Sequence, residues 1–114
     1  MKLTPSKVSD CLIVTLEGRL DSSSVSSAAA DFTALARGPE SVLLIDMSGV
    51  DVIDSSGLSL LLSVYRRRAE HDKSLALCGL SASVRRLIEL TRLHRLFQIH
   101  DTRERALKSM NYAA

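Results

Sequence analysis

The fold of this chain is decided by the stretch Leu44-Ile45-Asp46-Met47-Ser48-Gly49-Val50-Asp51-Val52-Ile53-Asp54-Ser55-Ser56-Gly57-Leu58. Its apolar beginning belongs to a run over residues 42–47 that is typical of a central strand covered on both faces. Its end places a carboxylate, two serines and a glycine at the start of an amphipathic helix. Such a helix start attracts anions, phosphate among them, because its first backbone N–H groups lack partners. A serine there is also a common N-cap, so the local pattern leaves both interpretations open.

The rest of the chain alternates between strand-like and helix-like segments. Strands are expected over about residues 3–8, 11–18, 42–47, 75–78 and 96–99. Helices are expected over about residues 24–37 and 56–71, after a cap at Ser81, and after a cap at Asp101 up to about residue 111. The first two strands pair antiparallel through a turn at Ser9-Asp10, and the later alternation predicts parallel strands with right-handed crossovers. The sequence therefore predicts one α/β domain over residues 1–114, with a mixed, mostly parallel sheet of about four to five strands and about four helices.

The expected helix over residues 56–71 carries apolar residues on more than one side. Its inner face is expected to consist of Leu58, Leu61, Leu62, Tyr65 and Ala69. Leu60 and Val64 fall off that stripe. We therefore expect these two side chains on the outer surface of the helix.

Arginines cluster at three places: residues 66–68, residues 85–86, and the pair Arg92 and Arg95. Three consecutive helical residues span most of the circumference of a helix, so residues 66–68 cannot form one flat basic stripe. We interpret them as a solvated helix end whose cations face the helix dipole favourably. An acidic partner surface is the alternative.

Composition excludes several classes of function. The 114 residues are 46% hydrophobic and 25% charged, with a net charge of +2, as in a globular domain. The chain has no Trp and only two Tyr and two Phe, which argues against a stacking platform for single-stranded nucleic acid. The longest uncharged helical stretch, residues 55–65, is far shorter than the roughly 20 apolar residues of a membrane span. We expect no nucleic-acid partner, no membrane segment, no signal peptide, and a cytoplasmic location.

Neither a metal nor a cofactor is indicated. His71, His94 and His100 lack the paired spacing of a zinc motif, and the Gly-rich phosphate loops are missing. Cys11 and Cys78 lie inside apolar strand-like runs, so we expect buried thiols and not a disulfide.

Three loops, over residues 18–24, 48–57 and 79–81, should meet at the carboxyl edge of the sheet. In and beside them lie many serines and the carboxylates Asp21, Asp46, Asp51 and Asp54. Paired carboxylates could hold a metal or act as acid and base, although short acidic residues are ordinary in turns and caps. A serine nucleophile would need a base within reach, and His71 lies about 22 Å along the helix from Ser56. We therefore expect no enzyme activity and disfavour a small serine hydrolase.

The central stretch resembles the signature of STAS domains, and within them it is closest to the bacterial anti-sigma factor antagonists. Three further segments match in order. Residues 17–21 resemble the Gly-x-Leu-Asp turn before the first helix, residues 77–87 the fourth strand and following helix, and residues 90–99 the approach to the last strand. The resemblance covers essentially the whole chain and implies the STAS fold. Ser59 departs from the family, which often has glycine there.

The resemblance also implies a phosphorylation switch. In the family, the serine after the motif's Asp is phosphorylated by a partner kinase that is also the anti-sigma factor; this position is Ser55, with Ser56 as the less favoured acceptor. Unphosphorylated members bind the kinase and free the sigma factor, phosphorylated members release the kinase, and a PPM-type serine phosphatase resets the switch. The implied partner-binding surface comprises Asp21, Ser22, Asp54, Ser56, Gly57, Leu58, Ser59, Leu60 and Val64.

The STAS fold also serves proteins without a phosphorylation cycle. The alternative function is a structural or ligand-sensing subunit of a stressosome-like or lipid-transporter complex. Because an antagonist must exchange its partners freely, we expect a monomer.

Overall fold

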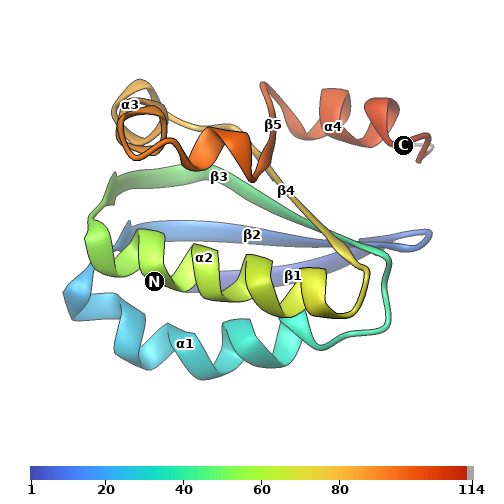
Figure 1. The fold of residues 1–114 in the computed structure, drawn as a ribbon, viewed down its shortest axis with the longest axis horizontal. Helices are drawn as coiled ribbons and strands as arrows, with labels where there is room; N and C mark the ends of the chain where they lie inside the picture. The colour runs from blue at the N-terminus through green and yellow to red at the C-terminus, as the bar shows by residue number, and fades with distance from the viewer. Residues whose placement is uncertain (113–114) are drawn as a thin grey trace.

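The computed structural model describes residues 1–112, which form one five-stranded sheet with helices on both faces (Figure 1). The elements in chain order are β1 (Lys2–Val8), β2 (Cys11–Leu20), α1 (Ser22–Ala36), β3 (Val42–Ile53), α2 (Ser55–Glu70), β4 (Ser74–Cys78), α3 (Ala82–Leu90), the 3-10 helix η1 (Leu93–Arg95), β5 (Gln98–His100) and α4 (Arg103–Ser109). The strands lie in the order β1-β2-β3-β4-β5; β1 is antiparallel to β2, and every later pair is parallel. The predicted mixed α/β sheet with four helices is confirmed. The last two residues of the predicted domain, 113–114, lie outside the described residues.

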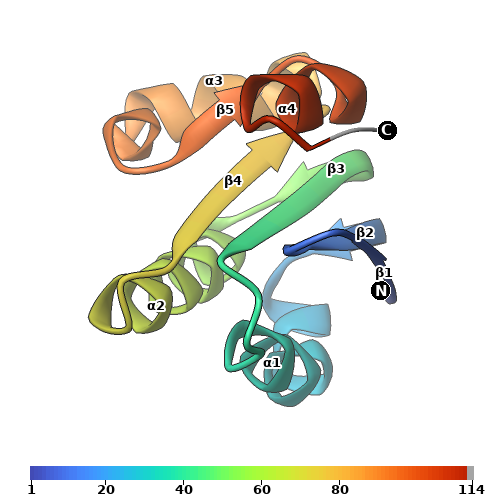
Figure 2. The same ribbon diagram turned by 90° about the vertical axis from the view of Figure 1, so that its right-hand side faces the viewer.

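Side chains of the three central strands alternate between two apolar layers. In β2, Leu12 and Val14 belong to one core cluster, and Cys11 and Ile13 belong to the other. The first cluster is covered by α1 and α2, which lie side by side on one face of the sheet (Figure 2). The second, smaller cluster is covered by α4. Both sides of β3 are thus buried, as the continuous apolar run predicted.

The inner face of α2 differs from the prediction. Its buried residues are Gly57, Leu58, Leu60, Leu61, Val64 and Arg68. Leu60 is 6% exposed and Val64 is 1% exposed, so the expectation that they lie on the outer surface is wrong. Ala69, expected inside, is exposed, and Leu62 and Tyr65 are only half-buried. The physical reason is that α2 packs against α1 as well as the sheet, which rotates its buried arc away from the stripe expected from spacing alone.

The expectation of a solvated arginine cluster is wrong for Arg68, which is 1% exposed. Its guanidinium donates hydrogen bonds to the backbone carbonyls of Glu40 (2.9 Å), Ser74 (3.2 Å) and Ala36 (3.4 Å). Burial lowers the pKa of Arg68 from its usual value. This side chain therefore ties the end of α2 to the end of α1 and to the start of β4.

Some element boundaries also differ from the prediction. β3 continues past the expected end at residue 47 to Ile53, because its pairing with β2 continues through two register shifts. Gly18 does not end β2 but lies within it at a φ of +114°, a conformation that favours glycine. Thr102 caps α4, not Asp101, whereas the predicted Ser81 cap of α3 is confirmed. Cys11 and Cys78 are buried free thiols, as predicted.

Candidate functional site

The ends of β2 and β3 bring two predicted site residues together. Leu20 and Ile53 are paired across the two parallel strands, so the residues that follow them, Asp21 and Asp54, begin neighbouring helices at one edge of the sheet. The backbone N–H of Ser22 donates to Oδ2 of Asp54 at 3.0 Å and joins the start of α1 to the start of α2. The predicted meeting of these two loops is therefore confirmed.

Asp54, not a serine, is the N-cap of α2. Its Oδ1 accepts hydrogen bonds from the backbone N–H groups of Ser56 (2.9 Å) and Gly57 (3.2 Å). The interpretation of a serine as the N-cap of this helix is therefore wrong. The consequence is that both serine hydroxyls are free of the capping role. Ser55, the first residue of α2, is exposed, whereas Ser56 is half-buried.

Gly57 sets how closely α2 approaches the sheet. A Cβ atom at this position would lie 2.3 Å from the carbonyl oxygen of Leu20 and 2.8 Å from Cγ1 of Ile53. No side chain fits there, so the glycine holds the first turn of α2 directly against the ends of β2 and β3. Ser55 is thereby presented from a rigid helix start and not from a flexible loop.

Asp21 caps α1 in the same manner. Its carboxylate accepts hydrogen bonds from the backbone N–H of Ser23 (3.1 Å) and from Nε of Arg19 (2.9 Å), while Ser24 Oγ accepts from the backbone N–H of Asp21 (3.1 Å). A hydrogen bond from the Ser23 hydroxyl, together with the one from Arg19, lowers the pKa of Asp21 to about 2. The carboxylates of Asp21 and Asp54 are therefore occupied by helix starts. No group of three or more His, Cys, Asp or Glu residues among residues 1–112 could hold a metal ion.

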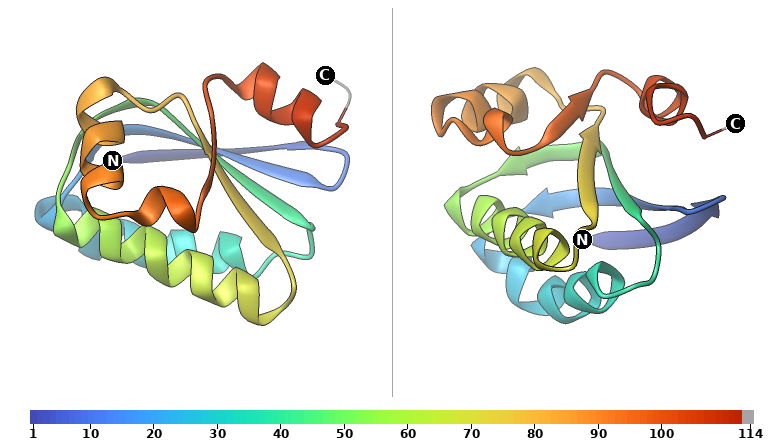
Figure 3. Two further views of the ribbon diagram at one scale, coloured as in Figure 1. Left: turned by 45° about the horizontal axis from the view of Figure 1, so that its top comes forward. Right: turned by 45° about the vertical axis from the view of Figure 1, so that its right-hand side comes forward.

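An apolar groove of about 240 Å³ opens beside Ser55. Its lining consists of Ser55, Leu58, Ser59, Leu62, Thr91 and Leu93. Figure 3 shows how the α3–η1 segment, in orange, comes to lie next to the start of α2, in light green. Sequence reasoning missed Leu62, Thr91 and Leu93 as site residues. Nothing in the local sequence pairs residues 91–93 with α2, because only the packing of α3 brings them there.

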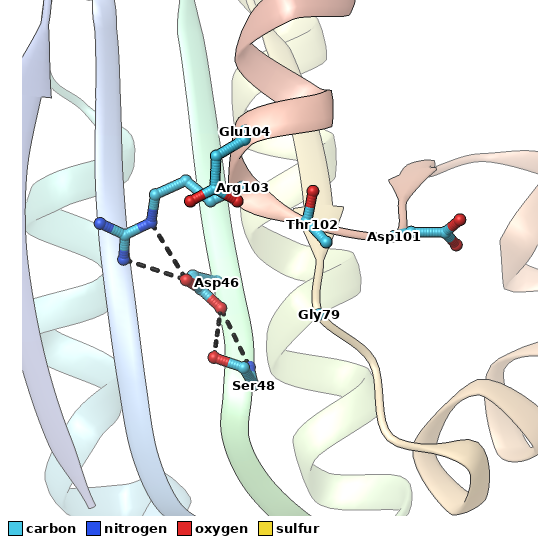
Figure 4. Close-up of a pocket in the computed structure, with 7 residues that line it drawn as sticks. All are labelled: Asp46, Ser48, Gly79, Asp101, Thr102, Arg103 and Glu104. Atoms are coloured by element: carbon cyan, nitrogen blue, oxygen red, sulfur yellow. Dashed lines mark hydrogen bonds and ion pairs between the residues drawn. The ribbon is translucent and has the colours of Figure 1, made fainter. Parts of the chain in front are cut away.

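Asp46, the third carboxylate that we expected in the loop cluster, lies in a separate pocket of about 400 Å³ beside the start of α4 (Figure 4). Its Oδ1 accepts from the backbone N–H (3.0 Å) and Oγ (2.8 Å) of Ser48, and its Oδ2 from Nε of Arg103 (3.1 Å). Burial favours a raised pKa for Asp46, but the bonds from Ser48 and Arg103 outweigh it and hold the pKa below its usual value. Both carboxylate oxygens are satisfied, so this pair fastens α4 to the sheet. Asp51 stays exposed on β3.

The STAS domain family matches residues 3–106. The chain belongs to the STAS domain family. This STAS domain is 29% identical over 113 residues to a Bordetella bronchiseptica protein described as a candidate anti-sigma factor antagonist, BtrV; the match covers 99% of this chain and 97% of that protein. It is also 29% identical over 101 residues to the anti-sigma F factor antagonist of Paenibacillus polymyxa, covering 87% of this chain and 86% of that protein.

Among solved structures, an anti-sigma factor antagonist from Mycobacterium paratuberculosis superimposes on the STAS domain with a TM-score of 0.88. The sequence identity is 22%, and the superposition covers 96% of this chain and 93% of that one. Likeness at this level of identity shows the fold. Among residues 1–112, no helix combines the length and the apolar character needed to cross a bilayer.

The predicted partner-binding residues of the STAS domain fall into two groups. Those that are at least partly exposed at the helix starts, or that line the groove, are Ser22, Asp54, Ser56, Leu58 and Ser59. Asp21, Gly57, Leu60 and Val64 are covered by the protein itself. Leu60 and Val64 face the core and cannot contact a partner, so the apolar surface beside Ser55 comes from Leu62 and Leu93 instead.

Proposed function

We propose that this STAS domain is an anti-sigma factor antagonist whose binding is switched by phosphorylation of Ser55. In its unphosphorylated form it binds an anti-sigma factor that is also a serine kinase, and thereby frees the target of that factor. The kinase phosphorylates Ser55, the complex then dissociates, and a PPM-type serine phosphatase removes the phosphate. The observation that carries the proposal is the exposure of Ser55 as the first residue of α2, directly after the aspartate that caps the helix. The two relatives described as antagonists support the same role.

The choice of Ser55 over Ser56 rests on accessibility. A kinase must place the acceptor oxygen in line with the γ-phosphate of ATP, which requires a hydroxyl that reaches solvent. Ser55 is exposed and its hydroxyl makes no hydrogen bond within residues 1–112. Ser56 is half-buried and holds its backbone N–H against Asp54. Ser55 is therefore the better acceptor.

A phosphate on Ser55 is compatible with the isolated fold. It adds about 1.5 to 2 negative charges at the positive end of the α2 dipole, where an anion is stabilised by about 0.3–1 kcal/mol. The carboxylate of Asp54 opposes it, but Ser55 is exposed, so water screens the repulsion. We infer that phosphorylation leaves the domain folded and acts at the interface.

At a desolvated interface the same charge is costly. Burying a new charge, or facing a like charge across the contact, costs several kcal/mol, and each 1.4 kcal/mol is tenfold in affinity. A phosphate in the contact with the kinase therefore suffices to weaken binding about 100-fold or more. Leu58 and Ser59 line the groove and lie nearest to Ser55 in sequence. They belong to the surface that we propose the kinase covers.

The acceptor assignment is tested by incubating the chain with its cognate kinase and ATP and mapping the phosphate by mass spectrometry. We expect phosphate on Ser55 in the wild type and in Ser56→Ala, and none in Ser55→Ala. Phosphate only on Ser56 would overturn the assignment of the acceptor. The absence of phosphate from both serines would overturn the proposed function.

The switch itself is tested with variants that fix one state. Ser55→Ala should bind the kinase constitutively, whereas Ser55→Asp and Ser55→Glu should bind poorly. A stable complex that is indifferent to Ser55→Asp would instead favour the structural or ligand-sensing subunit. Size-exclusion chromatography of each variant with the kinase distinguishes the two.

A further inference from the structure

Two exposed cations lie within two residues of Leu93, which lines the groove beside Ser55. Arg92 and Arg95 are exposed on the turn after α3 and on η1, and neither forms an ion pair within residues 1–112. Over residues 85–97, Glu89 is the only acidic residue. We call Arg92 and Arg95 the basic rim. The segment that supplies Thr91 and Leu93 to the groove therefore carries a net positive charge.

The same stretch exposes large apolar side chains. Leu90 is 71% exposed and Leu96 is 44% exposed, and they flank the turn that holds Arg92. Leu93, between them in sequence, lines the groove. An apolar strip with a charged border is typical of a protein-binding surface, although single exposed leucines are ordinary.

The basic rim is held firmly against α2. Phe97, which follows the rim, is 4% exposed, and its ring meets the ring of Tyr65 edge to face at a centroid distance of 5.7 Å. Arg92 adopts a left-handed backbone conformation with a φ of +61°, where glycine is the least strained residue. The turn therefore exposes an arginine side chain to solvent at a position where the backbone conformation favours glycine.

We propose that the groove and the basic rim receive an apolar segment of the anti-sigma kinase that is flanked by carboxylates. This inference rests on the proposed function, because it names the chemistry of the partner at that site. Apolar side chains of the segment lie in the groove between Leu62 and Leu93, and its carboxylates pair with Arg92 and Arg95. Charge complementarity selects an acidic occupant over a neutral or basic one.

Such an occupant also explains how Ser55 controls release. Ser55 lines the groove from the start of α2, whereas Thr91 and Leu93 line it from the end of α3 and from η1. A phosphate there adds negative charge to the groove that the acidic segment occupies. The like charges repel, and the phosphate competes for the cations of the basic rim. Because the occupant is acidic, phosphorylation of Ser55 weakens its binding and does not strengthen it.

The experiment compares how charge reversal of two arginines at each of two sites changes the affinity for the kinase. The test variant is Arg92→Glu/Arg95→Glu, and the control is Arg66→Glu/Arg67→Glu, whose arginines also form no ion pair within the described chain. The control site lies about 16 Å along α2 from Ser55. Calorimetric titration of the purified cognate kinase should show affinity about tenfold or more weaker for the test variant. The control should change affinity less than about twofold, and raising the salt concentration should reduce the difference.

Two further measurements keep the outcomes separate. Arg92→Gln/Arg95→Gln should lie between the wild type and the charge reversal, and thermal unfolding should show that all variants are folded. Wild-type affinity of the test variant, with release by Ser55→Asp intact, would overturn this inference and leave the proposed function standing. A kinase that neither binds nor phosphorylates the wild type would overturn both. Co-sedimentation with phosphatidylglycerol vesicles that is lost in the test variant, with kinase binding unchanged, would assign the basic rim to a membrane and overturn the inference.

Discussion

Replacing Asp54 with alanine should destabilise the domain because one carboxylate accepts hydrogen bonds from two helix starts. Its Oδ1 accepts from the backbone N–H groups of Ser56 and Gly57 in α2, and its Oδ2 accepts from Ser22 in α1. Alanine leaves all three donors without this acceptor. The change therefore loosens the surface that carries Ser55 as well as the cap of α2.

The magnitude follows from these contacts. Loss of an N-cap side chain costs about 1 kcal/mol, within a range of about 0.5–2 kcal/mol. Loss of the hydrogen bond from Ser22 adds about 1 kcal/mol. We expect Asp54→Ala to lower the free energy of unfolding by about 2 kcal/mol. Because the free energy of unfolding of such domains is about 5–15 kcal/mol, the variant stays folded and its stability can be measured.

The assay is urea denaturation followed by circular dichroism, with the free energy extrapolated to water. Asp54→Asn keeps an oxygen for the cap of α2 but turns an amide toward Ser22, so it should lose only about 1 kcal/mol. Asp51→Ala removes the same charge from an exposed site and should change stability by less than about 0.5 kcal/mol. Equal unfolding free energies for Asp54→Ala and Asp51→Ala would refute the reasoning.

Three further changes test the same structure. Gly57→Ala forces a Cβ atom to 2.3 Å from the Leu20 carbonyl oxygen and should cost about 1–3 kcal/mol in urea denaturation; a stabilised variant would contradict the close approach of α2. Arg68→Met leaves three carbonyl groups, two of them buried, without their donor and should cost about 3 kcal/mol, seen as a lowered midpoint of thermal unfolding. The pKa of Asp21 is lowered to about 2, so its ionised carboxylate stabilises the fold above about pH 5, and this contribution fades as the pH falls toward 2. The stability difference between wild type and Asp21→Asn should therefore shrink between pH 7 and pH 2, and a constant difference would contradict the assignment.

Element order and topology could be predicted because local signals agreed with one another. Period-2 and period-3.6 apolar patterns, the helix-ending pair Gly38-Pro39 after α1 and the alternation of strands and helices all favour a mixed sheet. The end of β3 could not be predicted, because Ser48 and Gly49 are typical loop residues. A Cβ atom at Gly49 would lie 2.8 Å from the Leu16 carbonyl oxygen, so this glycine serves a close strand approach and not a turn.

The candidate site was only partly readable from the sequence. Asp21 and Asp54 follow neighbouring parallel strands, so their meeting could be foreseen. The side of α2 that faces solvent could not be foreseen. Leu60, Leu62 and Val64 are all apolar, and only the packing of α1 decides which of them is buried. Arg68 is the same kind of case: its burial depends on carbonyl groups that the end of α1 and the start of β4 supply from a distance in sequence.

The measurement that tests the central claim most directly is the affinity of the cognate kinase for the Ser55-phosphorylated chain, compared with the unphosphorylated chain by calorimetry. We expect binding to weaken about 100-fold or more on phosphorylation and to recover after treatment with a PPM-type phosphatase. Circular dichroism should show the same fold in both forms. Equal affinity of the two forms for the kinase would contradict the claim that Ser55 is the switch.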